Sequence, residues 1–167
     1  MYTFSEKRPR AVASAREISY DRGKGGDGVI EILEQTPQLV LCVKPVGVRA
    51  QGEAEADLPA LLKRQLGCEI YPVHRLDQAV GGVMVFAKPA PAAAKLSQAI
   101  AGGTLQKEYL AVLERSPEQA EGELSDLLFH DRFKNKTYVV SKERKGVKKA
   151  SLSYRVVAEA DGLCLVH

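Results

Sequence analysis

The chain has 167 residues, of which 45% are hydrophobic and 27% are charged, and its net charge is +3. This composition fits one compact domain with a core of its own and excludes a chain that stays disordered. It also excludes membrane-spanning helices, because the apolar runs are far too short to cross a bilayer. Three widely spaced cysteines without a C-x-x-C pair argue against a zinc site or a disulfide framework, so we expect buried free thiols.

Residues 1–28 show no sustained hydrophobic period and end in a glycine-rich stretch. We interpret them as a flexible, basic N-terminal arm, followed by a folded domain over residues 29–167. The arm has no apolar segment typical of a signal peptide, so the default location is cytoplasmic, with no membrane partner. Its glycines match the pattern G-x-G-x-x-G, but without a preceding strand this match does not indicate a dinucleotide-binding loop.

The first half of the folded part is predicted to contain two helices among short strands. Leucines at helical spacing, with Gly67 as the stop signal, predict a helix that has Asp57 as its N-cap and runs to Leu66. A second, alanine-rich helix is predicted over Pro91–Ala101. Short apolar runs predict strands at Val29–Leu33, Leu39–Val43 and Val83–Ala87.

The second half is predicted to consist of strands. Runs in which polar and apolar residues partly alternate are found at Leu105–Leu113, Leu124–Phe129, Thr137–Ser141, Ser151–Ala158 and Leu163–Val166. Several neighbouring strands are joined by short turns, which favours antiparallel pairing. The sequence therefore predicts an α+β fold with a mostly antiparallel mixed sheet and flanking helices.

Positive charge is concentrated in one segment of the second half. Residues 131–149 include eight basic and two acidic residues, which gives this segment a net charge of +6. Such a segment is typical of a surface that binds a polyanion. It is equally typical of a solvated, lysine-rich hairpin, and charge alone does not decide between the two.

The densest group of polar residues is His74-Arg75-Leu76-Asp77, between a proline-containing loop and an apolar strand. On its own, this group is typical of a charged turn that caps a strand and pairs internally. Gly81-Gly82 follows, and two successive glycines give the backbone freedom where another segment approaches closely. Further on, the spacing around Tyr109 favours a core residue, although a phenol ring is also suited to stacking on a flipped base.

Three blocks, in this order, resemble the RluA-type RNA pseudouridine synthases. Leu39–Val48 is similar to that family's strand ending in a Lys-Pro-x-Gly turn. Val73–Lys88 is similar to the signature H-R-L-D-x-x-T-S-G followed by an apolar strand and Ala-Lys, and this block is the most specific. Lys107–Val112 matches the Lys-x-Tyr strand, and Gly146–Val157 also resembles a strand entry of the family.

The resemblance implies a pseudouridine-synthase-like catalytic domain and a role for each matched residue. Asp77 would be the catalytic carboxylate, as nucleophile or as base near the ribose. The reaction breaks the C1′–N1 bond of a uridine in RNA and rejoins the base through C5, so it needs no cofactor and no metal. Arg75 would help to extrude the uridine or hold nearby phosphate, and Tyr109 would pack against the flipped base. His74 would shape the turn, and Lys107 would complete the substrate-binding set.

RNA is the partner that the resemblance implies, either ribosomal or transfer RNA, bound by a monomeric protein. The basic segment would be the main RNA-facing surface, with Arg49 and the arm as lesser contributors. Its contacts with phosphate would weaken as the salt concentration rises. The residues expected to contact the RNA backbone are Arg132, Lys134, Lys136, Lys145, Lys148 and Lys149.

The sequence departs from the family pattern at two places. Val80-Gly81 stands where the signature has Thr-Ser, so two hydroxyl groups near the turn are missing. The family's T-G-R-x-H-Q-I-R motif, whose arginine is expected to pair with the catalytic aspartate, would lie beyond His167. We therefore expect the chain to correspond to the N-terminal two-thirds of a synthase. Two hypotheses follow, an RNA uridine isomerase or a non-catalytic RNA-binding remnant or inactive fragment of such an enzyme.

Overall fold

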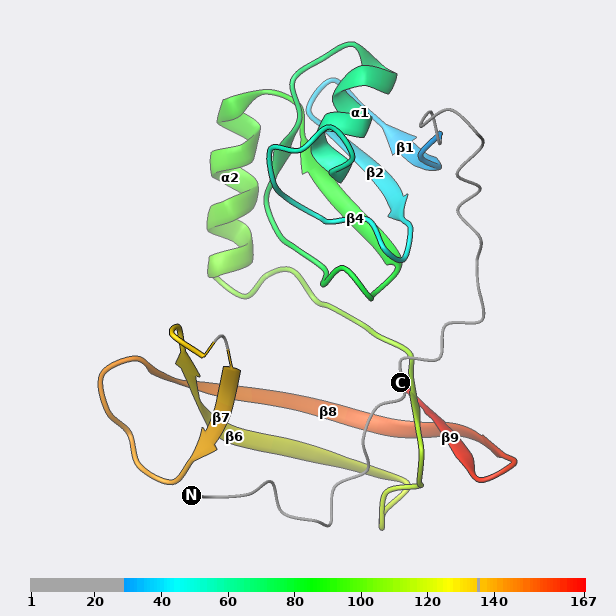
Figure 1. Cartoon of the computed structure of the whole chain (residues 1–167), viewed down its shortest axis with the longest axis vertical. Helices are drawn as coiled ribbons and strands as arrows, with labels where there is room; N and C mark the ends of the chain where they lie inside the picture. Colours follow the sequence, from blue (N-terminus) through cyan, green and yellow to red (C-terminus); the bar gives the residue numbers. More distant parts are fainter. Residues whose placement is uncertain (1–28, 135) are drawn as a thin grey trace. The chain divides into compact units, whose positions relative to one another are not determined.

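The computed structural model describes residues 29–134 and 136–167, so the expected N-terminal arm lies outside the described residues. The described residues form two compact units, residues 29–107 and residues 108–167, called here the first unit and the second unit (Figure 1). Each unit has its own antiparallel sheet, and both helices found in the described residues belong to the first unit. The prediction of an α+β fold with mostly antiparallel pairing is therefore confirmed.

The sheet of the first unit has four strands in the order β1-β2-β4-β3. Their bounds are Ile32–Gln35 for β1, Leu39–Lys44 for β2, Tyr71–Pro72 for β3 and Gly82–Ala87 for β4. The central pair, β2 and β4, is in register from Leu39 opposite Ala87 to Lys44 opposite Gly82. The last residue of β2 is therefore opposite the first residue of β4, and the loop that follows β2 lies beside the loop that precedes β4.

One face of this sheet carries the hydrophobic core. Along β2 the buried side chains alternate with half-buried ones, as the two-residue period of a strand requires. Val40 and Cys42 face Phe86 and Met84 across the register, and all four are fully buried.

Burial also raises the pKa of the Cys42 thiol to about 12. The cysteines in this structure are free, as expected, with Cys42 and Cys164 buried and Cys68 half-buried.

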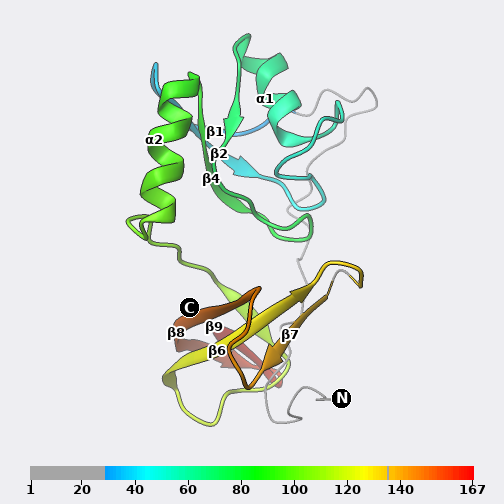
Figure 2. The same ribbon diagram turned by 90° about the vertical axis from the view of Figure 1, so that its left-hand side faces the viewer.

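Two helices cover the first unit's strands. Helix α1, Leu58–Leu66, turns Leu58, Leu61 and Leu62 into the core. Helix α2, Ala90–Ala101, packs against β4 and β3 (Figure 2). Both helices have a proline in the first turn, where the missing backbone N–H costs nothing.

The predicted side-chain cap of α1 is absent from the structure. Asp57 occupies the N-cap position, but its carboxylate makes no capping hydrogen bond to the helix. It is almost fully buried and accepts hydrogen bonds from Arg49 Nε at 2.7 Å and from the Ala54 backbone at 3.0 Å. Pairing with Arg49 stabilises the buried Asp57 carboxylate more than a helix cap would, because an unpaired buried charge is costly. The C-terminal signal was correct, since Gly67 ends the helix with a φ of 65°.

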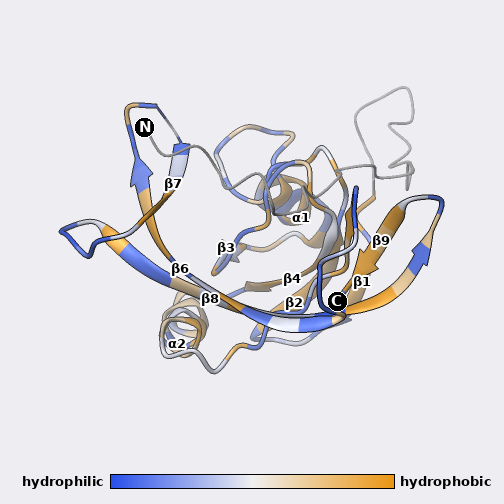
Figure 3. Ribbon diagram, turned by 90° about the horizontal axis from the view of Figure 1, so that it is seen from below, coloured by the Kyte–Doolittle hydropathy of each residue, from blue (hydrophilic) through white to orange (hydrophobic). Residues whose placement is uncertain are grey.

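The sheet of the second unit has five strands in the order β5-β9-β8-β6-β7. Their bounds are Ala111–Leu113 for β5, Glu121–Asp131 for β6, Lys136–Val140 for β7, Val147–Ala160 for β8 and Leu163–Val166 for β9. The long strands β6 and β8 form a curved ribbon on which hydrophilic and hydrophobic residues are mixed, whereas β9 is hydrophobic throughout (Figure 3). Within the described part of this unit, the buried side chains are Cys164 and Val166, so its core is small.

Several strand predictions need correction. The strand predicted at Val29–Leu33 lies at Ile32–Gln35, and β6 and β8 both begin earlier than predicted. The strand predicted at Leu105–Leu113 is limited to Ala111–Leu113, because the register with β9 begins at the pair Ala111 and Val166. A strand needs backbone partners on a neighbouring strand, and among the described residues the segment before Ala111 has none.

No helix among the described residues is long and apolar enough to cross a membrane.

Candidate active site

The His74-Arg75-Leu76-Asp77 group lies in the loop between β3 and β4, at the edge where β2 ends. The backbone closes a turn here, since Val80 N donates to the Asp77 carbonyl at 3.0 Å. Leu76 is half-buried and packs against the core of the first unit. We call residues 73–81 the Asp77 turn. Its apolar residue thus points into the protein, while its charged neighbours Arg75 and Asp77 are exposed.

A buried lysine supports the Asp77 turn. Lys44, the last residue of β2, is fully buried, and its partner in β4 is Gly82, which has no side chain to fill the space. The Lys44 ammonium donates to three carbonyl oxygens, those of Val48 at 2.7 Å, Pro45 at 2.9 Å and Gln78 at 3.3 Å. One cation therefore ties the loop after β2 to the Asp77 turn.

The charge state of Lys44 is set by two opposing influences. Burial lowers the pKa of its ammonium, because the charged form has lost its water. The negative charge of Asp77 acts in the opposite direction and raises that pKa. The carboxylate of the Asp77 turn thus interacts with a buried positive charge inside the same unit.

Backbone contacts add a second connection between the same two loops. Gly47 N donates to the Gln78 carbonyl at 2.8 Å, and Gln78 Nε2 donates back to the Gly47 carbonyl at 2.9 Å. Gly81 lies so close to the loop after β2 that a Cβ there would be 3.1 Å from Val46 Cγ2. This is the close approach that the two glycines predicted. The Val80-Gly81 departure from the family signature therefore coincides with a tightly packed position.

His74 connects the Asp77 turn to β4. Its Nε2 accepts a hydrogen bond from the backbone N–H of Val85 at 3.0 Å, which requires a ring that is unprotonated at this nitrogen. Burial lowers the pKa of His74, and the positive charge of Lys107 lowers it further. Both effects favour the neutral ring that this hydrogen bond needs. This hydrogen bond therefore connects the Asp77 turn to β4.

Asp77 itself is open to solvent. Its side chain is 77% exposed, and its nearest cation is Arg75, whose Nη2 lies 3.4 Å from Oδ1. Both partners are exposed, so this ion pair contributes little to stability. A carboxylate on a hydrogen-bonded turn with its oxygens accessible can act as a nucleophile or as a base toward a docked substrate. The guanidinium beside it is suited to hold a phosphate.

The remaining predicted substrate residues divide between the units. Lys107 closes the first unit and lies close enough to His74 to affect its pKa. Tyr109 belongs to the second unit, where it precedes β5 rather than lying within a strand, and its side chain is about half exposed. The interpretation of Tyr109 as a core residue is therefore wrong. Its ring is available for contacts, because no packing of the core consumes it.

The predicted RNA-contacting residues all lie in the second unit, along β7, β8 and the loops next to them, and all are exposed. These residues are Arg132, Lys134, Lys136, Lys145, Lys148 and Lys149. Arg49, a lesser candidate, is instead paired with the buried Asp57 in the first unit. The structure thus puts the predicted basic surface and the Asp77 turn on different units.

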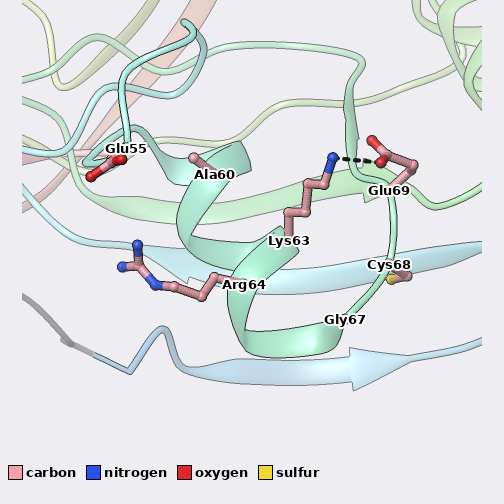
Figure 4. A pocket seen from close by; sticks show the side chains of 7 residues that line it. All are labelled: Glu55, Ala60, Lys63, Arg64, Gly67, Cys68 and Glu69. Atoms are coloured by element: carbon pink, nitrogen blue, oxygen red, sulfur yellow. Dashed lines mark ion pairs between the residues drawn. The ribbon is translucent and has the colours of Figure 1, made fainter.

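A hollow of about 750 Å³ beside α1 is separate from this site (Figure 4). None of its lining residues belongs to the Asp77 turn, and its Lys63 ammonium is already paired with Glu69 at 2.5 Å. Among the described residues, no three histidine, cysteine or acidic side chains lie close enough together to hold a metal ion.

Sequence reasoning missed the support provided by Lys44 and Gln78. The burial of Lys44 could have been predicted, because Val40, Cys42 and Lys44 occupy alternate positions of β2 and therefore point to the same, buried face. A lysine at the end of such a row has either to turn outward or to find buried acceptors. No comparable signal marked Gln78, whose contacts depend on how the two loops meet.

Comparison with known proteins gives the context for this site. The chain matches the family model for RNA pseudouridylate synthases over residues 38–166. It is 33% identical over 90 residues to tRNA pseudouridine synthase C of Pasteurella multocida, an alignment covering 50% of this chain and 37% of that protein. It is 37% identical over 91 residues to RNA pseudouridine synthase 7 of Oryza sativa, covering 52% of this chain and 23% of that protein.

The fold has solved counterparts as well. The structure of human RNA pseudouridylate synthase domain containing 4 superposes with a TM-score of 0.66 at 24% identity, covering 81% of this chain and 57% of that one. The chain thus spans only about a quarter to just over half of the length of these similar proteins. The family match covers most of the chain and includes the Asp77 turn, β2 and the basic segment. This chain therefore belongs to the RNA pseudouridylate synthase family.

Proposed function

We propose that the protein isomerises uridine to pseudouridine in RNA and that Asp77 is its catalytic carboxylate. The C1′–N1 glycosidic bond breaks, the base turns over, and a bond from C1′ to C5 replaces the lost one. The proton at C5 leaves and a proton is gained at N1, so atoms and charge balance without a cofactor. The carboxylate serves as nucleophile or as base in this sequence.

One observation carries this proposal, namely that an exposed carboxylate stands on a turn that hydrogen bonds anchor to the neighbouring loop and strand. The bond from Lys44 to the Gln78 carbonyl, a reciprocal pair between Gly47 and Gln78, and the bond from Val85 to His74 all restrain it. Pre-organisation of a reactive group is what catalysis by proximity requires.

Arg75 and the basic residues of the second unit suit a polyanionic substrate. Arg75 would hold a phosphate beside the reacting uridine, and Tyr109 would stack on the flipped base. Transfer RNA is the first substrate to test, because the similar Pasteurella multocida protein is named as a tRNA pseudouridine synthase. We also propose a monomer that works in the cytoplasm, which light scattering and fractionation would test.

The test is detection of pseudouridine by mass spectrometry after incubation of the purified chain with unmodified tRNA and rRNA. We expect conversion by the natural chain and none by Asp77→Asn, which is nearly the same size but cannot act as nucleophile or base. Asp161→Asn, an exposed carboxylate in the turn before β9, is the matched control and should convert normally. RNA binding is measured in parallel for all three proteins.

The same experiment separates the two hypotheses for this chain. Conversion that disappears only in Asp77→Asn supports the isomerase. RNA binding without conversion by a folded natural chain would instead support a non-catalytic RNA-binding remnant. Equal conversion by Asp77→Asn and the natural chain would show that another group carries the reaction.

A further inference from the structure

A second hollow, of about 840 Å³, lies in the second unit where β6, β7 and β8 meet, and the Asp77 turn takes no part in it. Basic, aromatic and aliphatic side chains line it together. Its lining includes Leu128, His130, Arg132, Phe133, Thr137 and Lys148. Its volume falls in the range typical of small-ligand pockets.

The strand register puts four of these side chains on one face of the sheet. Leu128 and His130 are two residues apart on β6, so they point to the same side. Leu128 is opposite Lys148 of β8, and His130 is opposite Thr137 of β7. Directly opposed residues also share a face. The apolar side chain of Leu128 and the ammonium group of Lys148 therefore lie on the same face as His130 and Thr137. The Nδ1 atom of His130 is 3.2 Å from the Thr137 hydroxyl oxygen.

Phe133 lines the hollow from the turn between β6 and β7 and is completely exposed, at 104% of its reference area. The turn that presents it is held by Asp131, whose Oδ1 accepts from the backbone N–H groups of Phe133 at 3.0 Å and Lys134 at 3.1 Å. The phenyl ring therefore has no part in holding the turn. A large apolar ring left in water is typical of a contact surface.

The charge around Phe133 is positive. Arg132, Lys148 and Lys149 line the hollow and are exposed, while its acidic residue, Asp131, is engaged with the turn. Cations combined with an exposed aromatic ring are the elements that bind single-stranded nucleic acid, because the cations hold phosphates and the ring stacks on a base. A base inside a duplex has both faces covered by its neighbours, so the ring can only use an unpaired one.

We propose that this hollow binds an unpaired nucleotide of the RNA, with its base stacked on Phe133 and its phosphate held by Lys148 and Arg132. The proposal rests on the proposed function only in taking RNA as the ligand. It assigns to the second unit a recognition site of its own, which reads whether the RNA is single-stranded at that point.

The experiment measures binding of a 12-nucleotide single-stranded RNA that contains 2-aminopurine, a base whose fluorescence is quenched when it stacks. We expect the natural chain to quench the fluorescence and to bind the single strand more tightly than a duplex of the same length. Phe133→Ala should lose the quenching and weaken binding by about 5- to 100-fold, as loss of one base–aromatic contact does. Phe133→Trp should restore both.

Matched variants control for general effects. Val157→Ala, also exposed and apolar but outside the hollow, should bind like the natural chain. Lys148→Gln should lower the slope of log affinity against log salt by about one, more than Lys142→Gln, which lies outside the hollow. Circular dichroism of each variant establishes that it is folded.

Three results would overturn the proposal. Unchanged quenching in Phe133→Ala is the first, and equal affinity for single strand and duplex is the second. The third is equal binding of polyglutamate, which would make the hollow a general anion patch. Because binding is read directly, absence of isomerisation with intact stacking would reject the proposed function alone. Isomerisation without stacking on Phe133 would reject this inference alone.

Discussion

Lys44 is the single residue whose replacement tests the support of the Asp77 turn most directly. Lys44→Met keeps the length of the side chain but removes the donor of three hydrogen bonds to buried or half-buried carbonyls. We expect the free energy of unfolding to fall by about 2–4 kcal/mol, as for other buried polar networks that lose one member. Urea denaturation measures this, and pseudouridine formation should fall with it.

Lys63→Met provides the comparison, since Lys63 is exposed and pairs with Glu69 at the surface. An exposed pair of this kind contributes little to stability, so this variant should unfold almost like the natural chain. If Lys44→Met were as stable as Lys63→Met, the network around Lys44 would not support the turn.

His74 predicts a dependence of stability on pH. Its pKa in the folded chain lies below the ordinary value of 6.5 because of burial and Lys107. Between these two pKa values the unfolded chain binds the extra proton and the folded chain does not. The free energy of unfolding should therefore fall as the pH drops below 6.5 and level off below the folded pKa.

His74→Gln isolates this contribution, because an amide oxygen can still accept from the Val85 N–H but does not titrate in this range. Urea denaturation at several pH values between 5 and 8 should show a smaller loss of stability in this variant. Identical pH profiles for the two proteins would exclude His74 as the source.

At the scale of elements, the junction of β4 with the Asp77 turn depends on Gly82. Its φ of +145° lies in a region that side chains rarely adopt. A Cβ at this position would be 3.6 Å from Leu76 Cδ1, which is ordinary contact, so the cost of Gly82→Ala comes from the backbone. We expect about 1–3 kcal/mol of destabilisation, measured by thermal or urea unfolding.

Val83→Ala, at the next and exposed position of β4, is the matched control. It removes two methyl groups from the surface and should change stability by less than about 1 kcal/mol. Equal effects of the two substitutions would show that β4 tolerates a side chain at Gly82, and that the backbone there is not held in this conformation.

The helices were predicted more accurately than the strands, for a physical reason. Each helix has a periodic apolar face and a glycine stop that act within a few residues, as at Gly67. The ends of a strand depend instead on where its neighbour supplies hydrogen bonds. β8 extends from Val147 to Ala160 because β6 and β9 pair with it, although its lysines and serines give little hydrophobic pattern.

The site shows the same division. The charged turn and its close-packed glycines could be predicted from the sequence, because His74-Arg75-Leu76-Asp77 and Gly81-Gly82 are local signals. The contacts of Lys44 with the Gln78 carbonyl span 34 residues, and only the fold brings these loops together. The exposure of Phe133 was equally hidden, since the sequence around it does not tell which ring is left uncovered.

At the scale of the whole molecule, the two units should differ in stability. The first unit encloses a core that includes Val40, Met84 and Phe86, whereas the described part of the second unit buries little besides Cys164 and Val166. Local opening requires less free energy where few apolar contacts are lost. We expect amide hydrogens of β2 and β4 to exchange far more slowly than those of β6 and β7.

Hydrogen exchange followed by mass spectrometry of peptides from each unit measures this difference. Addition of single-stranded RNA should slow exchange in β6, β7 and β8, because a bound ligand stabilises the state that binds it. Equal protection in the two units without RNA would show that the second unit is stabilised by more than its visible core.

The restraints on the Asp77 turn also bear on how the protein is made. Every contact described for the turn is made by residues before position 108. All the residues that hold the turn have therefore been synthesised once the ribosome has added Lys107. Ribosomes add about 5–20 residues per second, and domains tend to fold in the order of their synthesis. The Asp77 turn can therefore take its folded form before β7 and β8 are complete, so synthesis separates in time the turn that carries Asp77 from most of the basic residues of the second unit.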